Sequence, residues 1–381
     1  MEVIIMARKR ANGEGTIKQR SDGRWEGQYS IGYTRKSVYG KTQEEVRKKL
    51  TKIQSDIDNS LYIEDTKILV ADWLKVWLHE YKKPSIKQKT FENYEILVNS
   101  HLIPAFPKIK LKDLKTNHVQ QFINSEIKRG LSNRTVKYVV TLLSSALEQA
   151  VKTDMINKNV SKAVELPKKT AKKERRILDR QEQEKLLSIL ENERMGVAIL
   201  TALYTGLRRG ELLALRWSDF DKENGTLTVR QNLSRLKGKD GKSHLEFTTP
   251  KTKTSNRTIP LLPEITAKLN AHKKVQTLEK FKVGQLWEHN DLIFCTEFGK
   301  PIEPRNLIRI LERLTATLEI PKINVHALRH TFATRAIEQG MTLKAVQEIL
   351  GHSSIVMTAD IYTHVSNEYK KEEMQKMRAV L

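Results

Sequence analysis

Six side chains in the C-terminal half of the sequence have types that suit phosphate chemistry. They are two arginines, a lysine, two histidines and a tyrosine: Arg208, Lys251, His326, Arg329, His352 and Tyr362. Guanidinium groups bind phosphate oxygens bidentately and stay charged at any working pH. A tyrosine hydroxyl, with a pKa near 10, needs help with deprotonation, which a histidine can give near neutral pH. A lysine can protonate a leaving oxygen, so this set is typical of phosphoryl transfer to a tyrosine without a metal ion.

Each of these residues, taken alone, also has a structural interpretation. Arg208 stands where an apolar helix ends at Gly206 and a new helical pattern starts, so it could be a surface arginine in a helix turn. Lys251 lies in the polar segment 249–256, which we expect to be the tip of a β-hairpin, where a solvated lysine is common. A single histidine or tyrosine in such a chain is usually structural. The combination, not any one residue, favours chemistry.

Two short predicted helices lie around the two histidines and precede the tyrosine. His326 and Arg329 open a helix that ends at Gly340, and Thr342 begins a second helix that stops at Gly351, directly before His352. Two such helices could also form a helix-turn-helix that reads DNA. That alternative stays open at this point.

The rest of the C-terminal half is predicted to mix helices and strands. Residues 195–204 are apolar enough for a buried helix, and residues 226–230 and 257–261 are rich in the β-branched residues that strands favour. Helices return after Glu303.

Residues 66–166 are predicted to be entirely helical. One helix carries an apolar stripe, a second starts near Thr90 and stops at Pro104, a third runs from Thr116 to Gly130, and a fourth starts at Ser132. The stripe contains Trp73 and Trp77, which we expect in the helical core rather than on a base-stacking platform.

Residues 13–41 are predicted to form three short strands, followed by a helix that a capping box of Thr42 and Glu45 begins. A small sheet of this kind can enter a DNA groove, or it is a basic module without that role. The segment 167–176 has almost no apolar residues and dense positive charge, and we interpret it as a linker.

The composition indicates a polyanionic partner. The 381 residues contain 68 Lys and Arg against 45 Asp and Glu, a net charge of +23, which suits DNA, RNA or an anionic membrane surface. The one cysteine, Cys295, excludes a disulfide framework and a cysteine-based zinc site. The apolar start of the chain, residues 1–6, is too short for a signal peptide or a membrane span. We expect a soluble protein that stays inside the cell and has no membrane partner.

The motifs that carry these residues resemble the tyrosine recombinases, also called the phage integrase family. The matching pieces are Thr-Gly-Leu-Arg208-x-Gly-Glu, Lys251-Thr followed by Arg257-Thr-Ile-Pro-Leu, His326-x-Leu-Arg329-His, Leu-Gly-His352 and Tyr362-x-His, in the family's order. The sequence most resembles integrases of Gram-positive prophages and conjugative transposons, over the whole chain.

The resemblance implies a role for each residue. Arg208 and Arg329 would bind the scissile phosphate, and Tyr362 would attack it and form a 3′-phosphotyrosine. His326 would act as base or phosphate ligand, and His352 would bind the phosphate or support the nucleophile. Lys251 would be the general acid, with Lys253 as the alternative. Glu211 would orient the region of Arg208, and no cofactor or metal is implied.

The resemblance also implies a multidomain fold. An arm-type DNA-binding domain, with a small three-stranded β-sheet plus a helix, would span residues 1–64. An all-α, SAM-like core-binding domain would span 65–166, the basic linker 167–176, and a mixed α+β, mainly helical catalytic domain 177–381.

The implied partners are double-stranded DNA, with core-type and arm-type sites, and further copies of the chain in a tetramer on DNA. A small excisionase and a host DNA-bending protein are further candidates. The amphipathic tail after Val365 would dock on a neighbouring subunit or pack on its own. Two other functions remain as alternatives: DNA relaxation as in type IB topoisomerases, and DNA-binding regulation without catalysis.

Overall fold

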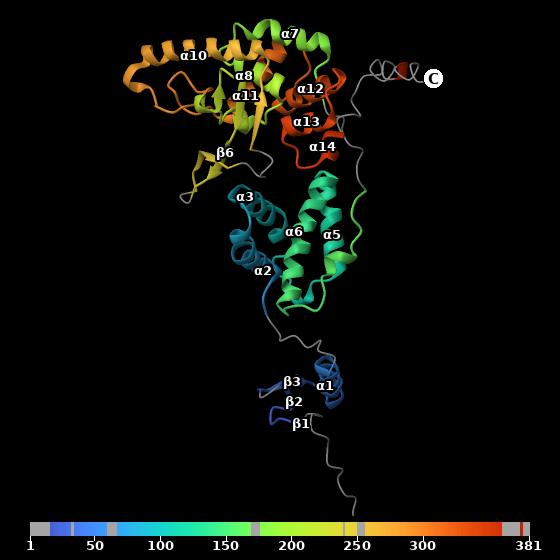
Figure 1. The fold of residues 1–381 in the computed structure, drawn as a ribbon. Helices are drawn as coiled ribbons and strands as arrows, with labels where there is room; N and C mark the ends of the chain where they lie inside the picture. Colours follow the sequence, from blue (N-terminus) through green and yellow to red (C-terminus); the bar gives the residue numbers. More distant parts are fainter. Residues whose placement is uncertain are drawn as a thin grey trace, which may run out of the picture. The chain divides into compact units, whose positions relative to one another are not determined.

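The computed structural model describes residues 16–31, 34–58, 67–168, 176–238, 241–249, 256–359 and 374–375 (Figure 1). The chain divides into two units, Met1–Ala171 and Lys172–Leu381, and each is described by itself. Within the described ranges, no helix has the length and apolar character needed to cross a membrane.

The N-terminal module has the three strands and the helix that the sequence predicted. The antiparallel sheet β1–β2–β3 (Thr16–Gln19, Trp25–Ile31, Thr34–Gly40) is followed by α1 (Gln43–Asp58). Tyr29 of the sheet is buried together with Val46 and Leu50 of the helix. The Thr42 hydroxyl accepts from the Glu45 N–H at 3.2 Å, whereas the Glu45 carboxylate accepts from the Lys41 N–H at 2.9 Å. The reciprocal half of the predicted capping box is therefore displaced by one residue.

Residues 67–168 form the predicted helical bundle. Its helices are α2 (Val70–Val76, continued by π-helical Trp77–Lys82), α3 (Gln88–Leu97, continued by π-helical Val98–Leu102 and α4, Ile103–Ala105), α5 (Thr116–Lys128) and α6 (Asn133–Lys152). Trp73 and Trp77 are 3% and 0% exposed, and the Trp73 indole N–H donates to the Ala146 carbonyl at 2.9 Å. Their prediction as core residues is confirmed.

The C-terminal unit combines helices with two small sheets. Its helices are α7 (Arg180–Leu190), α8 (Gly196–Thr205), α9 (Arg209–Leu212), α10 (Pro263–Val283), α11 (Pro304–Thr317), α12 (Val325–Glu338), α13 (Leu343–Leu350) and α14 (Ile355–Ala359). Its strands are β4 (Phe220–Asp221), β5 (Thr226–Val229), β6 (Asn232–Lys237), β7 (Ser243–Thr248) and β8 (Arg257–Pro260). The buried helix α8 and the strands β5 and β8 agree with the sequence-based prediction.

One connection differs from that prediction. Residues 249–256 were expected at the tip of a hairpin, but β7 pairs with β6 and β8 pairs with β5, in two different sheets. The segment therefore joins two sheets, and the hairpin interpretation is wrong. The physical reason is that the polar excursion after β5 forms a hairpin of its own, with Leu233 of β6 buried and Phe247 of β7 opposite it packed against the same core.

Of the two helices that could have formed a DNA-reading helix-turn-helix, α12 is largely buried, whereas α13 buries only Val346 and Leu350 of its eight residues. Nine of the fourteen residues of α12 are buried, among them Leu328, Arg329 and Ile337. α12 packs against α8 inside the unit, so it is not a helix that could lie in a major groove. These helices hold side chains in place for a site.

Candidate active site

The break between α8 and α9 places Arg208 at the start of a helix. Gly206 ends α8 with φ 62°, a left-handed conformation that suits glycine. A Cβ there would lie 2.5 Å from Leu350 and 2.7 Å from Phe332, so the close approach also requires glycine. Arg208 is the N-cap of α9, and Glu211 accepts from its backbone N–H at 3.0 Å and from its Nη1 at 2.7 Å. Glu211 therefore contacts both the backbone and the side chain of Arg208.

Arg329 lies under this break, on the buried side of α12. It is 4% exposed, and its Nη1 donates to the Gly206 carbonyl at 2.7 Å and its Nη2 to the Leu350 carbonyl at 2.8 Å. Burial, together with the nearby Arg208, lowers the pKa of Arg329 to about 9. The group is still positive at neutral pH, so the two arginines bring two charges to one place.

The C-terminal end of α13 holds three arginines together. The carbonyls of Ile349, Leu350 and Gly351 accept from Arg257 (2.5 Å), Arg329 (2.8 Å) and Arg208 (3.1 Å) respectively. The last carbonyls of a helix have no partner within the helix and carry partial negative charge. Guanidinium groups from three different elements therefore satisfy them, and this fixes the arginines relative to one another.

His352 follows α13 directly and is 8% exposed. Its Nδ1 lies 2.9 Å from the hydroxyl oxygen of Thr358, in α14. Burial lowers the pKa of His352 to about 3, and the positive charges of Arg329 and Arg208 add to this effect. The imidazole is therefore neutral at physiological pH, with one nitrogen held by Thr358.

His326 is exposed on the first turn of α12, and its ring centroid lies 6.5 Å from that of His330. A spacing of three residues places His326 on the same side of the helix as Arg329. Lys251, Lys253, Tyr362 and most of the predicted amphipathic tail lie outside the described residues. The structure thus brings Arg208, Arg329 and His352 together, with His326 one turn along α12.

Arg257 lies in one of the motifs that resemble the family, but the sequence did not indicate a role for it. Its side chain is 7% exposed, and its Nη2 forms an ion pair with Glu211 at 2.9 Å. Burial favours the neutral carboxyl of Glu211, but the hydrogen bond and the charge of Arg257, with Arg208, lower its pKa overall. Glu211 is therefore ionised and pairs with Arg208 and Arg257, so that the cluster of three guanidiniums contains a single carboxylate. The surplus positive charge suits an anion such as a phosphodiester.

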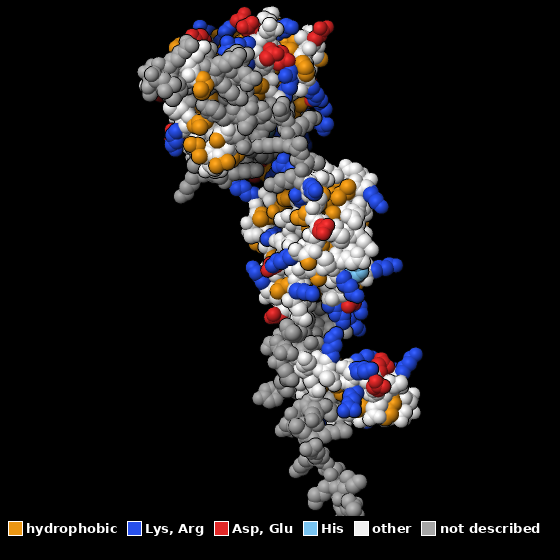
Figure 2. Space-filling model, turned by 90° about the vertical axis from the view of Figure 1, so that its right-hand side faces the viewer, with side chains coloured by type: hydrophobic (Ala, Val, Ile, Leu, Met, Phe, Trp, Pro, Cys, Tyr) orange, Lys and Arg blue, Asp and Glu red, His pale blue; other side chains and the backbone are white. Residues whose placement is uncertain are grey.

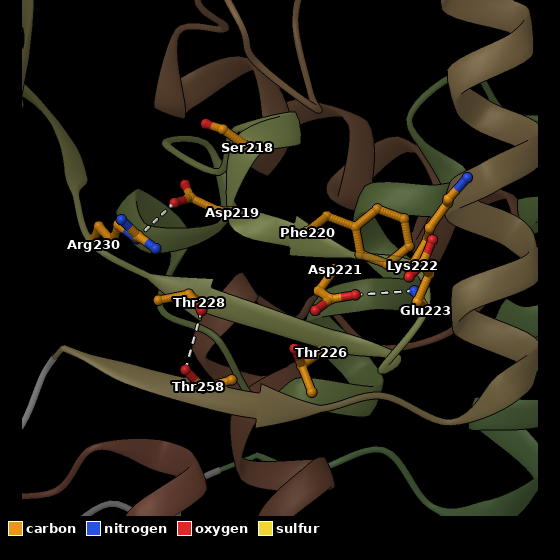
Figure 3. Close-up of a pocket in the computed structure, with 10 residues that line it drawn as sticks. All are labelled: Ser218, Asp219, Phe220, Asp221, Lys222, Glu223, Thr226, Thr228, Arg230 and Thr258. Atoms are coloured by element: carbon orange, nitrogen blue, oxygen red, sulfur yellow. Dashed lines mark hydrogen bonds and ion pairs between the residues drawn. The ribbon is translucent and has the colours of Figure 1, made fainter.

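A surface pocket lies over the face of the β4–β5–β8 sheet that points away from Arg257 (Figure 3). The hydroxyls of Thr228 and Thr258 are 3.1 Å apart there, and Arg230 pairs with Asp219 at 3.2 Å. Because side chains alternate along a strand, Arg257 projects from the other face, beside buried Ile259. The pocket is separate from the arginine cluster.

Lys and Arg side chains are numerous on the face that Figure 2 shows. Over the ranges that the structure describes, no three His, Cys, Asp or Glu side chains are grouped so that they could hold a metal ion.

Comparisons with known proteins agree with this arrangement. Residues 176–369 match the phage integrase family, and residues 69–127 match the N-terminal SAM-like domain of phage integrases. The chain is 32% identical over 361 residues to a XerC-like tyrosine recombinase of Caldanaerobacter subterraneus, covering 90% of this chain and 91% of that protein. It is 29% identical to the integrase of Staphylococcus phage L54a, covering 87% and 98%.

Solved structures show the same fold. The integrase of transposon Tn1549, in complex with a circular intermediate DNA, has a TM-score of 0.68 at 24% identity and covers 81% of this chain and 99% of its own. The lambda integrase tetramer bound to a Holliday junction has a TM-score of 0.58 at 19% identity, covering 93% and 96%. The fold is thus multidomain, with an N-terminal three-stranded sheet, a SAM-like helical domain and an integrase catalytic domain. The chain belongs to the phage integrase family, and it is a site-specific tyrosine recombinase of the kind that mobile elements encode.

Proposed function

We propose that this protein integrates and excises a mobile element by cutting and rejoining double-stranded DNA through a 3′-phosphotyrosine on Tyr362. The observation that carries the proposal is the convergence of Arg208, Arg329 and neutral His352 at the end of α13. The Tyr362 oxygen attacks the scissile phosphorus and forms a bond to it. The bond between that phosphorus and the 5′ oxygen of the DNA breaks, and the 5′ oxygen leaves as a hydroxyl.

The two arginines bind the non-bridging oxygens, whose negative charge grows in the transition state. Arg329 is fixed by two carbonyls beneath the site, whereas the Arg208 side chain is 32% exposed and can reach the DNA. His352 hydrogen-bonds the phosphate or supports the nucleophile. His326, being exposed at the start of α12, acts as base or phosphate ligand.

Lys251 is the proposed general acid, and Lys253 is the alternative. A substrate with sulfur in place of the bridging 5′ oxygen separates the two, because a thiolate leaves without being protonated. Lys251→Met should cleave the ordinary DNA slowly and the sulfur-containing DNA at nearly the wild-type rate. If Lys253→Met shows that rescue instead, the general acid is Lys253.

The phosphotyrosine conserves the energy of the phosphodiester. Attack by a free 5′-hydroxyl on the Tyr362–phosphate bond rejoins DNA and restores the tyrosine. The proposed reaction therefore uses neither ATP nor a resident cofactor.

We propose that the three domains divide the work on DNA. Residues 1–64 bind arm-type sites and residues 65–166 bind core-type sites. Residues 177–381 carry catalysis after the linker 167–176. The lambda integrase tetramer on a Holliday junction and the Tn1549 integrase on DNA support a tetramer that exchanges one strand pair at a time. The protein would act on DNA in the bacterial cytosol, with an excisionase or a DNA-bending protein setting direction.

A nicked core-site duplex tests this proposal, because loss of a short fragment after cleavage traps the covalent complex. The wild-type protein should give a complex that survives denaturing electrophoresis, and Tyr362→Phe should bind the DNA but give none. Absence of any complex with the wild-type protein would indicate a DNA-binding regulator instead. Relaxation of supercoils without site preference would indicate a topoisomerase.

A further inference from the structure

We propose that Arg257 is a positioning residue for DNA cleavage, which holds the Arg208 guanidinium in its phosphate-binding orientation by sharing the Glu211 carboxylate with it. This inference rests on the proposed function and adds a residue that acts on the site without touching DNA.

Glu211 divides its two oxygens between the two arginines. Its Oε1 accepts from Arg208 Nη1 at 2.7 Å, and its Oε2 accepts from the Arg208 backbone N–H at 3.0 Å and from Arg257 Nη2 at 2.9 Å. A guanidinium next to a carboxylate prefers to bind both oxygens in parallel. Arg257 and the Arg208 backbone N–H both donate to Oε2, so the Arg208 side chain binds only Oε1, and its Nη2 donates to the Gly351 carbonyl at 3.1 Å.

Removal of Arg257 would therefore change the orientation of Arg208. Oε2 would then keep only the Arg208 backbone N–H as a donor, and the Arg208 side chain could turn both of its terminal nitrogens toward Glu211 and away from Gly351, which directly precedes His352. Because Glu211 is only 4% exposed, water cannot easily replace Arg257 as its partner. The turn toward Glu211 would take a phosphate-binding nitrogen away from the DNA.

Arg257 also joins two elements of the site that are far apart in sequence. Its Nε donates to the Ile349 carbonyl at the end of α13 at 2.5 Å, while its Nη2 reaches Glu211 in α9. Only a guanidinium presents donors in two such directions from one rigid plane, whereas a lysine has a single nitrogen. We therefore expect that lysine at position 257 will keep the charge but will not restore the geometry.

The test compares two DNA duplexes that differ only at the scissile phosphate, an ordinary phosphodiester and a methylphosphonate. The methylphosphonate has a methyl group in place of one charged oxygen, so its cleavage depends less on Arg208. Arg257→Gln should slow single-turnover cleavage of the phosphodiester roughly 100-fold, with Arg257→Lys also defective. The defect should be much smaller on the methylphosphonate.

Arg230→Gln is the matched control, because Arg230 also pairs with an acidic residue but over the opposite face of the same sheet. It should cleave both duplexes like the wild-type protein. An equal loss by Arg257→Gln on both duplexes would show a merely structural role and overturn the proposal. Wild-type rates for Arg257→Gln, or full activity of Arg257→Lys, would overturn it as well.

A binding measurement separates failure of this inference from failure of the proposed function. In the Tyr362→Phe background, the protein with Arg257 should bind the phosphodiester duplex more tightly than the methylphosphonate duplex, and Arg257→Gln should lose that preference. If the preference is lost but no wild-type cleavage occurs, the cleavage proposal fails and the positioning role stands. If the preference persists in Arg257→Gln, the positioning role fails.

Discussion

Acidification should destabilise the catalytic half of the chain through His352. Its pKa is about 3 in the folded protein, against about 6.5 in an unfolded chain. Between these values the unfolded state binds one more proton than the folded state. The stabilising contribution of neutral His352 is therefore complete above pH 6.5 and is lost as the pH falls toward 3.

The size of the effect follows from this difference in pKa. Each pH unit within the window should cost at most about 1.4 kcal/mol of unfolding free energy, and the whole window no more than about 5 kcal/mol. His352→Asn removes the titrating group while leaving a polar side chain beside Thr358. The wild-type protein should therefore lose more stability than His352→Asn between pH 6.5 and 4.5.

Urea unfolding probed by pulse proteolysis can measure this loss, with peptides from residues 196–205 and 325–338 reporting on the catalytic half. The buffer should contain neither phosphate nor sulfate, because an anion beside the arginines would favour the protonated imidazole. His289→Asn, at an exposed position, is the control and should follow the wild-type curve. Parallel curves for the wild-type protein and His352→Asn would refute the assignment of a buried neutral histidine.

Three further substitutions test the packing of the helical bundle and of the C-terminal unit. Trp73→Phe should lower the free energy of unfolding of the helical bundle by about 1–2 kcal/mol in urea titrations, because the Ala146 carbonyl loses its buried donor. Glu126→Ala should cost about 3 kcal/mol in the same assay, since the 3% exposed carboxylate pairs with His101. Gly206→Ala should cost the catalytic half about 2–4 kcal/mol, measured by pulse proteolysis, because a Cβ clashes there and the left-handed backbone is strained. Wild-type stability in any one of these three variants would contradict the packing described for the substituted residue.

The sequence predicted most elements because their signals are local. Ser132 caps α6 and Thr342 caps α13, each accepting from a backbone N–H three residues on, and Gly351 ends α13 in the left-handed conformation. The family resemblance implied one site for Arg208 and Arg329, and the structure brings them together at the end of α13.

Long-range pairing was the part that the sequence did not reveal. The strand that pairs with β7 is the one that best buries the apolar face of β7. In the structure this strand is β6 and not β8. The 21-residue helix α10 was not predicted, because it buries only Ile265 and Leu269 and exposes Leu278 and Phe281. An amphipathic stripe is the signal for such a helix, and here it is weak.

The role of Arg257 depends on Glu211, 46 residues away in sequence. One signal in the sequence could have indicated this role. Arg257 and Ile259 are two residues apart in a predicted strand, so both side chains lie on its inward face. A cation there must be buried and therefore needs a carboxylate partner. Nothing local identifies that carboxylate as Glu211.

The most direct test of the central claim is to locate the covalent bond between protein and DNA. The trapped complex from the nicked core-site duplex can be digested with nuclease and protease and sequenced by mass spectrometry. We predict a single modified residue, Tyr362, joined to a 3′-terminal nucleotide phosphate, with a free 5′-hydroxyl on the departing strand. A nucleotide on another of the ten tyrosines, on a different residue type, or linked through a 5′-phosphate would contradict the account.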